Sequence, residues 1–244
     1  MTKLRPAMLL VLCLCLSATF AQADQLYQTG SDGSQLFVTN TTNGSTALIG
    51  NFGFSAVYGD AFSPSGQLYA MVNSYSPSTL ATVNIATGAA TLVGAPTGIA
   101  DLMGIVFAPD GTLYGASWST NSLYTLNTST GAATLVGSLG LPGGTNMDLT
   151  WDYQNNTMYG ISNGGPDGSL LYSVNLATGA GTLVTNIPGN SCLMGLATDH
   201  AGNFLATDWC SSNSPLYQIN PTTGALTNLG LTGISSPMGG DIYS

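Results

Sequence analysis

The chain has 244 residues, a formal net charge of −9, 44% hydrophobic residues and only 5% charged residues. Its two basic residues, Lys3 and Arg5, lie at the extreme N-terminus, and all eleven acidic residues are Asp. Nucleic-acid binding is nearly excluded, because phosphate recognition requires Lys or Arg. A helical protein held by surface salt bridges is excluded too, since it needs Glu, Lys and Arg.

The first 23 residues have the features of an export signal. A positively charged start is followed by an apolar run at 8–16 and by small residues at Ala21 and Ala23, the positions that a signal peptidase recognises. The apolar run is too short to span a bilayer, and no second stretch of spanning length follows. We therefore expect a signal peptide at 1–23, a single domain at 24–244, no transmembrane segment, and secretion to the periplasm or the extracellular space.

A strand-turn-strand motif recurs along the rest of the chain. Each copy has a short strand-forming segment that ends at an Asn, a Gly four residues later, and then a second strand-forming segment. Gly at the turn adopts positive φ at little cost, which favours a hairpin. The five Asn and Gly pairs are Asn40 and Gly44, Asn84 and Gly88, Asn127 and Gly131, Asn175 and Gly179, and Asn220 and Gly224.

A second hairpin precedes four of these motifs. Its strands are predicted at 58–62 with 68–72, 103–107 with 113–117, 147–151 with 158–162, and 194–198 with 204–208. Four strands in each period of about 45 residues is the signature of a propeller blade. The complete blades are expected at 55–98, 99–143, 144–190 and 191–233.

The two ends of the mature chain carry complementary parts of one more blade. The C-terminus offers one strand at 238–243, and the N-terminus offers three, at 25–30, 35–40 and 45–50. The sequence therefore predicts an all-β, five-bladed β-propeller of four-stranded blades, closed by N- and C-terminal strands that share one blade. Closure completes the blade that would otherwise leave an open inner sheet edge, and open edges promote aggregation. A solenoid is the competing architecture, but it does not need complementary half-units at its ends.

The repeat resembles a known group. The pattern Leu-Tyr-Thr-Leu-Asn at 123–127, with Thr-Gly-Ala-Ala-Thr-Leu-Val-Gly at 130–137, resembles secreted bacterial β-propeller repeat proteins. The turn at 108–114 is similar to that of NHL-like and quinoprotein-like propeller repeats. The resemblance covers essentially all of 24–244 and implies blades, but it transfers no catalytic residue.

Two cysteines, Cys192 and Cys210, remain after the signal is removed. They lie at the outer ends of two strands whose connecting turn is centred near 200–202, so they are expected to face each other and form a disulfide. Two Cys and one His do not supply a convincing zinc site.

The ends of the second strands supply a candidate binding face, which we call the upper face. In propellers the loops at these ends and the loops between blades share one side of the ring. Two Trp and two Asn there could stack on a sugar and hydrogen-bond it, or the Trp could pack between blades. The aligned residues are Ser31, Asn73, Trp118, Asn163 and Trp209.

The innermost strands carry a second aligned set. We include Tyr58 among the candidate ligand contacts, and we expect the Met residues to fill irregular space between blades. The alternative is that the four thioethers bind Cu(I). The set is Tyr58, Met103, Met147, Met194 and Met238.

Three acidic residues, Asp60, Asp148 and Asp241, are predicted on inner strands near the axis. The mature chain has no Lys or Arg to neutralise them, so they must face water, take up protons or hold a cation. A Ca²⁺ site is one hypothesis, since Ca²⁺ prefers Asp and carbonyl oxygens. Solvated carboxylates are the alternative.

No constellation of catalytic residues is evident. Without Glu, the usual carboxylate pair of propeller glycosidases is missing, and His200 sits in a predicted turn beside Asp199 with no nucleophile context. We expect a secreted, non-enzymatic binding or interaction module with a carbohydrate or protein partner on the upper face. The alternatives are a structural subunit of an extracellular layer or filament, for which an oligomer is expected, and a divalent-cation-dependent hydrolase.

Overall fold

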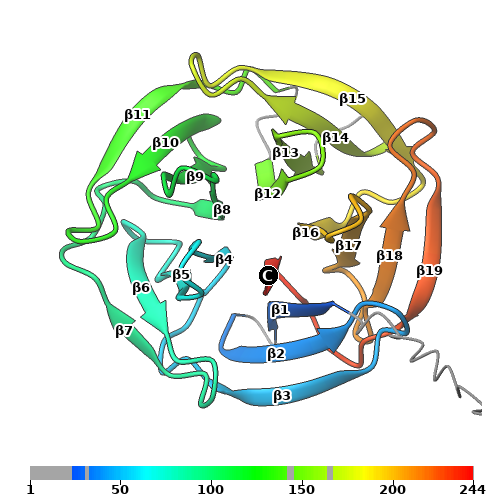
Figure 1. The fold of residues 1–244 in the computed structure, drawn as a ribbon, viewed down its shortest axis with the longest axis horizontal. Helices are drawn as coiled ribbons and strands as arrows, with labels where there is room; N and C mark the ends of the chain where they lie inside the picture. Colours follow the sequence, from blue (N-terminus) through cyan, green and yellow to red (C-terminus); the bar gives the residue numbers. More distant parts are fainter. Residues whose placement is uncertain (1–23, 31–32, 142–145, 164–166, 244) are drawn as a thin grey trace, which may run out of the picture.

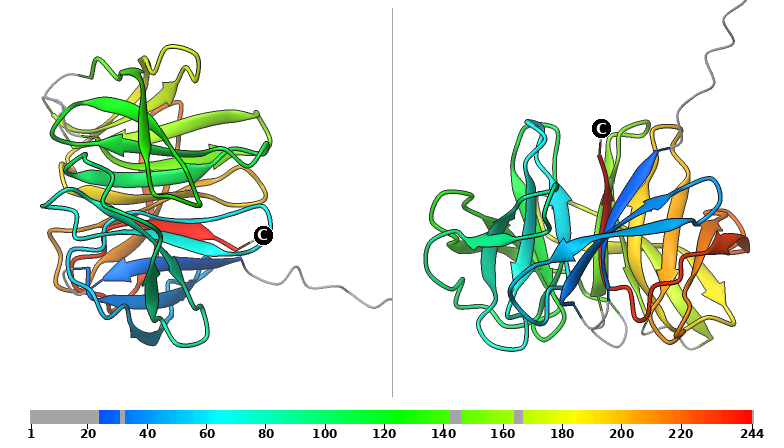
Figure 2. Two further views of the ribbon diagram at one scale, coloured as in Figure 1. Left: turned by 90° about the vertical axis from the view of Figure 1, so that its left-hand side faces the viewer. Right: turned by 90° about the horizontal axis from the view of Figure 1, so that it is seen from below.

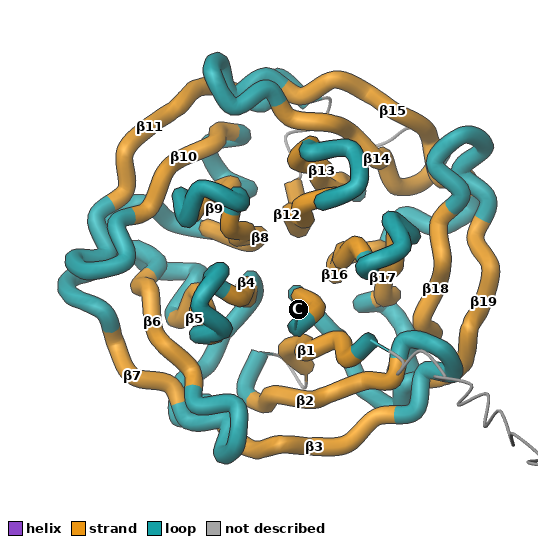
Figure 3. Tube along the Cα trace, in the orientation of Figure 1, coloured by secondary structure: helices purple, strands orange, loops and turns teal. Residues whose placement is uncertain are grey.

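The computed structural model describes residues 24–30, 33–141, 146–163 and 167–243. Within these residues there are twenty strands, and no helix long and apolar enough to cross a membrane. The strands form five four-stranded sheets that stand like blades around a central axis (Figure 1). The tube view in Figure 3 shows the same ring built from strands and loops. The predicted five-bladed propeller is confirmed.

The blades are numbered here in chain order, and each is given from axis to rim. Blade 1 contains β20 (Gly240–Ile242), β1 (Gln25–Gly30), β2 (Gln35–Asn40) and β3 (Thr46–Asn51). Blade 2 contains β4 (Asp60–Phe62), β5 (Leu68–Val72), β6 (Thr79–Val83) and β7 (Ala90–Leu92). Blade 3 contains β8 (Leu102–Phe107), β9 (Leu113–Ser117), β10 (Ser122–Leu126) and β11 (Ala133–Ser138). Blade 4 contains β12 (Asn146–Asp152), β13 (Thr157–Ser162), β14 (Gly168–Val174) and β15 (Gly181–Pro188). Blade 5 contains β16 (Leu193–Thr198), β17 (Phe204–Asp208), β18 (Pro215–Ile219) and β19 (Leu226–Leu231).

The two ends of the propeller chain meet in blade 1, as predicted. β20 pairs antiparallel with β1, and Ile242 lies opposite Leu26. Figure 2 shows β20 alongside the N-terminal strands in both side views. At the ends of this pairing, the Met238 N–H donates to the Thr29 carbonyl at 3.1 Å and the Tyr243 N–H donates to the Gln25 carbonyl at 3.3 Å. The ring is therefore closed by main-chain hydrogen bonds between residues that are far apart in sequence.

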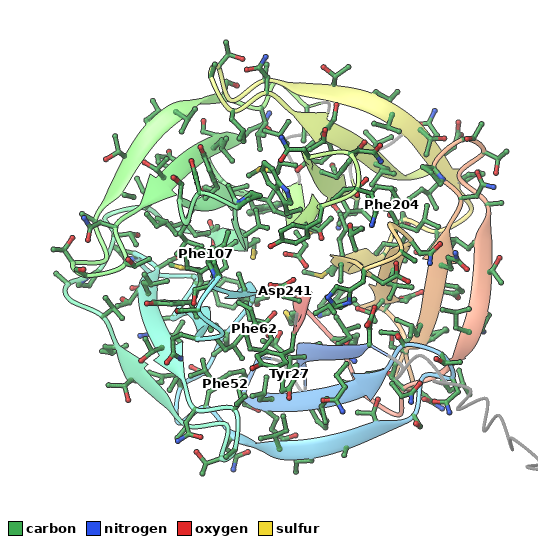
Figure 4. All side chains as sticks on the ribbon, in the orientation of Figure 1. Tyr27, Phe52, Phe62, Phe107, Phe204 and Asp241 are labelled. Atoms are coloured by element: carbon green, nitrogen blue, oxygen red, sulfur yellow. A yellow bond between two sulfur atoms is a disulfide. The ribbon has the colours of Figure 1, made fainter. Side chains whose placement is uncertain are left out.

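Aromatic rings join the closing blade to its neighbour. The Tyr27 ring packs edge-on against Phe62 of β4, with centroids 5.1 Å apart, and Tyr243 packs against Phe62 at 5.0 Å. Figure 4 shows Tyr27 and Phe62 together between blades 1 and 2. Edge-to-face pairs of this kind add to the stabilisation from apolar burial, so the seam between blades 1 and 2 is both hydrogen-bonded and packed.

The recurring Asn and Gly residues form the turn between the third and fourth strand of each blade. At Asn84 the carbonyl accepts the Gly88 N–H at 2.8 Å, while the side-chain oxygen accepts the Ala86 N–H at 2.9 Å. Gly88 has φ of +77°, and a Cβ on it would lie 2.8 Å from the Gly50 carbonyl carbon in the neighbouring blade. Gly is required there both for the turn shape and for the close approach of adjacent blades.

Burial follows position along each blade. Inner strands such as β8 and β16 are buried at every residue, because they face the axis and two neighbouring blades. Outer strands such as β11 contain only partly buried and exposed residues. The core is thus a set of apolar clusters between blades, and the axis itself is lined by the inner strands.

Candidate functional site

A cavity of about 290 Å³ opens at the upper end of the ring axis. We call it the axial pocket. Its floor is the aligned inner-strand set Tyr58, Met103, Met147, Met194 and Met238. Its wall consists of Tyr75, Asp101, Trp118, Asn163 and Trp209. The lining is therefore dominated by thioether and aromatic side chains.

β-bulges bring the methionines to the floor. In β8 the partner of Leu102 is Ser117 and the partner of Gly104 is Ala116, so Met103 is an extra residue without a partner. The same register shift leaves Met147 unpaired in β12 and Met194 unpaired in β16. A bulge re-aims a side chain away from its regular direction, and here the extra residue is the one that lines the pocket.

The same local irregularity shortens two inner strands. Strands were predicted from residues 58 and 238, whereas β4 begins at Asp60 and β20 begins at Gly240. Tyr58 and Met238 lie just before these strands, at the position that the bulged methionines occupy in the other blades. All five floor residues thus lie where the regular pairing between the first and second strands of their blade is interrupted.

Hydrogen bonds to the preceding loop hold both tryptophans of the wall. The Trp118 N–H donates to the Asp101 carbonyl at 2.8 Å, and the Trp209 N–H donates to the Cys192 carbonyl at 2.9 Å. Each Trp side chain is 42% exposed. The indoles are therefore anchored through their backbones while a large part of each ring stays open to solvent, and neither is sequestered between blades.

Blade 2 departs from the predicted pattern. Asn73 is exposed and does not line the pocket; it has a left-handed backbone with φ of +56°, and its carbonyl accepts the Ser76 N–H at 3.1 Å. The turn that Asn73 forms presents Tyr75 instead. The Tyr75 ring packs edge-on against Tyr58 with centroids 5.3 Å apart, and their hydroxyl groups are in contact.

Four of the five predicted ligand contacts therefore lie together in the axial pocket: Tyr58, Trp118, Asn163 and Trp209. Tyr75 and Asp101 were not predicted for this site. The signal for Tyr75 is an aromatic residue shortly after the second strand of blade 2, which has no Trp at the aligned position. Ser31, the aligned residue of blade 1, and the predicted signal peptide lie outside the described residues.

The predicted disulfide between Cys192 and Cys210 is present, with a Cα separation of 5.7 Å. The bulge at Met194 shifts the register, so that Leu193 pairs with Asp208, and the Cys192 carbonyl meets the Trp209 N–H rather than Cys210. The two cysteines are therefore bridged diagonally, not directly opposite as predicted. The bridge fastens the strand end that carries Trp209.

Replacing Cys192 and Cys210 by Ser is expected to lower the free energy of unfolding by about 3 kcal/mol, since the bridge spans 18 residues of sequence. Denaturant unfolding of the wild-type protein with and without dithiothreitol measures the same loss. The double Ser variant should not respond to the reductant. Equal unfolding midpoints for the oxidised wild-type protein and the variant would contradict the stabilising role.

His200 lies at the opposite end of the axis from the pocket. Its ring Nδ1 is 2.8 Å from Asp24 Oδ1, and its side chain is 54% exposed. Asp199 accepts the Ala201 and Asn203 N–H groups and shapes the predicted turn. Within the described residues, the hydrogen bonds of the His200 side chain go to Asp24 and not to a hydroxyl group.

The three inner-strand carboxyl groups differ in their partners. Asp148 is fully buried, and its two oxygens accept the N–H groups of Leu149 and Leu196, the latter in the next blade. Asp241 lies near the ring centre in Figure 4, and its Oδ2 accepts the Phe62 N–H of blade 2 at 2.7 Å. Asp60 is 1% exposed, and neither of its oxygens has a hydrogen-bond partner among the described residues.

Burial raises the pKa of all three carboxyl groups. The pKa of Asp241 is raised to about 6, against the opposing effect of its hydrogen bonds from Phe62 and Ile242. The pKa values of Asp60 and Asp148 are raised well above the ordinary range, first by burial; the charge of Asp241 raises that of Asp60 further. In the part of the chain that the structure describes, these three Asp do not form a group whose oxygens all lie within 4.8 Å of one another. The Ca²⁺ hypothesis for these three carboxylates stays a prediction.

One group of potential metal ligands within that distance does occur among the described residues: Cys192, Asp208 and Cys210. The two sulfur atoms are joined in the disulfide. Asp208 uses its oxygens to accept the Cys210 N–H and the Asn190 side-chain amide. This group therefore serves the blade 5 loop.

Several solved structures share the fold. The chain in a nidogen–laminin complex is 14% identical, with a TM-score of 0.58, covering 91% of this chain and 98% of that one. A protein of unknown function from Bacteroides thetaiotaomicron is 15% identical, with a TM-score of 0.61, covering 85% and 55%. A periplasmic gluconolactonase from Pseudomonas aeruginosa is 10% identical, with a TM-score of 0.52, covering 91% and 99%. At these identities the likeness extends to the fold alone.

The sequence itself matches a family of repeats. No curated protein matches the chain. Residues 14–192, which are most of the chain, match the family described as a repeat of unknown function (DUF6923). The predicted resemblance to propeller repeat proteins is thereby confirmed, and the chain belongs to the DUF6923 family of repeats of unknown function.

Proposed function

We propose that the protein is a secreted, non-enzymatic binding module that holds an apolar side chain of a partner protein in the axial pocket. The observation that carries this proposal is the composition of the pocket: a floor of Met and Tyr beneath two half-exposed Trp. Pockets of this kind, apolar with few polar groups, are the usual ligand sites of proteins. Trp and Tyr at such sites supply most of the binding free energy in protein interfaces.

The polarity of the lining favours a protein partner over a sugar. Sugar recognition requires several directional hydrogen bonds, and among the described lining residues only Asp101 and Asn163 carry a carboxylate or amide side chain. Methionine is flexible and polarisable, so the floor can adapt to side chains of different shape. A carbohydrate is the second candidate, because the open faces of Trp118 and Trp209 suit stacking on a sugar ring.

The arrangement of titratable groups supports a binding role without catalysis. Among the described residues, Asp101 and the tyrosine hydroxyls are the titratable groups that line the axial pocket, and His200 lies at the other end of the axis. General acid–base or nucleophilic catalysis needs such groups within hydrogen-bond reach of one another. The disulfide supports export, since such bonds persist in oxidising compartments.

A structural subunit is the other candidate that an observation favours. Four outer strands expose a leucine at an equivalent position, and these strands form the free edges of their sheets. Free apolar edges can pair with another copy. Size-exclusion chromatography separates the candidates, since ordered polymers would favour the subunit and a monomer the binding module. The leucines are Leu48, Leu92, Leu135 and Leu183.

A binding test does not require an identified partner. Peptides selected from a random library, and a glycan array probed in parallel, are compared between the wild-type protein and a Trp118→Ala/Trp209→Ala variant. We expect peptides with an apolar anchor to bind the wild-type protein and to lose at least about tenfold in affinity in the variant, as for truncated interface tryptophans.

The matched control is Tyr153→Ala, which removes an exposed aromatic ring that lines a small cavity at the opposite end of the axis. Its affinity should equal that of the wild-type protein. Glycans that bind in a Trp-dependent manner, without peptides, would favour the carbohydrate candidate. Ligands that are insensitive to the two tryptophans would contradict a role for the axial pocket.

A further inference from the structure

The methionines of this chain are concentrated in one place. Six methionines lie between residues 24 and 244, and four of them form the floor of the axial pocket. The other two, Met71 and Met158, are buried in the apolar core at 0% and 1% exposure. Four of the blades thus each contribute one thioether to the same small surface.

The floor methionines lie on a narrow ring. The residue that follows each floor position lies at a close contact between inner strands of adjacent blades. A Cβ added to Gly104 would lie 2.6 Å from the Asp148 Cα, and one added to Gly239 would lie 2.1 Å from the Tyr58 carbonyl oxygen. Adjacent floor residues are therefore about one strand spacing apart around the axis. All four methionines and Tyr58 belong to one cluster of packed side chains.

Each floor methionine is also accessible from the pocket. The four side chains are 3–6% exposed, and each lines the axial pocket. Packing alone does not require sulfur, because Leu has nearly the same volume and fills equivalent space in cores. A ring of four neutral sulfur donors facing one apolar cavity is a suitable environment for a soft metal ion.

The donor atoms of the floor and the charges around it indicate which kind of metal ion would bind. Thioethers are soft ligands that select Cu(I), whereas Ca²⁺ and Mg²⁺ require oxygen ligands. Among the described residues the pocket is lined by one carboxylate, Asp101 on the wall, and residues 24–244 contain no Lys or Arg. No basic side chain therefore opposes entry of a cation, and the net negative charge of a chain that carries Asp without Lys or Arg attracts one.

We propose that Met103, Met147, Met194 and Met238 bind one Cu(I) ion on the floor of the axial pocket. The sulfur atoms coordinate the ion as neutral donors, so binding releases no proton and involves no redox step. The tryptophans of the wall stand above the ion and limit the access of water and oxidants. This site goes beyond the proposed partner binding, which requires no metal.

The test measures Cu(I) affinity under anaerobic conditions, by competition with the chromogenic chelator bicinchoninate. The wild-type protein is compared with a variant in which the four floor methionines are replaced by Leu. The matched control is Met71→Leu/Met158→Leu, which changes the two methionines outside the pocket. We expect one Cu(I) per chain for the wild-type protein and the control, and at least a hundredfold loss of affinity in the floor variant.

A second measurement covers the case in which the floor variant does not fold. Methyl-¹³C-methionine NMR spectra of the wild-type protein are recorded with Ag(I), which mimics Cu(I) and is stable in air. The methyl signals of the four floor methionines should shift at one equivalent of Ag(I), while those of Met71 and Met158 remain in place. Absence of these shifts, more than one ion per chain, or equal affinities for the wild-type protein and a folded floor variant would overturn the proposal.

The two proposals can fail separately. The Trp118→Ala/Trp209→Ala variant keeps all four sulfur atoms, so it should still bind one Cu(I). The floor variant changes residues that also line the peptide site, so it is used for Cu(I) affinity alone, and peptide binding is assessed with the Trp118→Ala/Trp209→Ala variant. A wild-type protein that binds Cu(I) but selects no peptide would overturn the proposed partner role alone, and a wild-type protein that binds peptides but no Cu(I) would overturn the metal site alone.

Discussion

Deleting residues 238–243 is expected to abolish cooperative folding. The deletion removes β20, which is the innermost strand of blade 1 and the partner of β1. Leu26 and Tyr27, which are 3% and 9% exposed, would then face solvent at an open sheet edge, and such edges promote aggregation. Circular dichroism during heating should show no sharp transition, and light scattering should rise at temperatures where the full chain stays clear.

A circular permutant serves as the control for this deletion. Because Tyr243 lies next to Gln25, a short turn can join residue 243 to residue 24, and new ends can be opened between Asp110 and Gly111. This turn is exposed and connects β8 to β9, so blade 3 would then be closed by the two chain ends. The permutant should fold with a transition close to that of the full chain. A cooperative transition in the deleted chain would show that the shared blade is dispensable.

Most of the fold could be predicted because its signals are local and repeated. The Asn and Gly residues of each turn make hydrogen bonds within five residues, as Asn84 and Gly88 do, so their spacing appears directly in the sequence. Once the four-stranded blade is recognised, the single strand at the C-terminus and the three strands at the N-terminus indicate that together they complete one blade and close the ring. The disulfide was predicted by pairing residues across the hairpin outward from its turn, and the predicted register differs from that of the structure by one residue.

The details of the pocket could not be predicted, because they depend on how five inner strands meet at one axis. The unpaired positions of Met103, Met147 and Met194 arise from bulges, and nothing in a single strand signals a bulge. Tyr75 lines the pocket in place of the predicted Asn73, because Asn73 adopts a left-handed turn conformation. The missing partners of Asp60 arise from packing across blades, which the residue sequence of one strand does not contain.

Replacing Asp60 by Leu is expected to stabilise the protein at pH 8. The aligned positions in blades 3, 4 and 5 are apolar: Ile105, Leu149 and Leu196. Asp60 is 1% exposed and has no hydrogen-bond partner among the described residues. A buried polar group without a hydrogen-bond partner costs about 1–3 kcal/mol of stability, and replacing it by a packed apolar side chain removes that cost. Thermal unfolding detects this as an increase of roughly 2–4 °C per kcal/mol.

The stabilisation should depend on pH, and its sign is fixed by the pKa of Asp60. Burial and the charge of Asp241 raise this pKa well above its ordinary range, so the folded state favours the protonated acid. The contribution of Asp60 to stability is then fully present below pH 4, the range of an unfolded Asp, and is lost as the pH rises through the folded-state pKa. The Asp60→Leu variant should therefore gain less over the wild-type protein at pH 4 than at pH 8. Asp110→Asn is the control, because the Thr112 N–H lowers the pKa of Asp110 and gives a pH dependence of opposite sign.

The same measurement distinguishes two states of the buried Asp60 side chain at pH 8: a protonated acid, and a carboxylate that binds a cation. If Asp60→Leu is more stable than the wild-type protein at pH 8, Asp60 has no charged partner in the folded wild-type protein. Protonation then keeps the buried side chain neutral. If the variant is less stable at pH 8, a cation bound by the ionised carboxylate is the candidate cause, since no Lys or Arg occurs between residues 24 and 244. Repeating the melts with Ca²⁺ and with a chelator then identifies the cation, because only the wild-type transition should move.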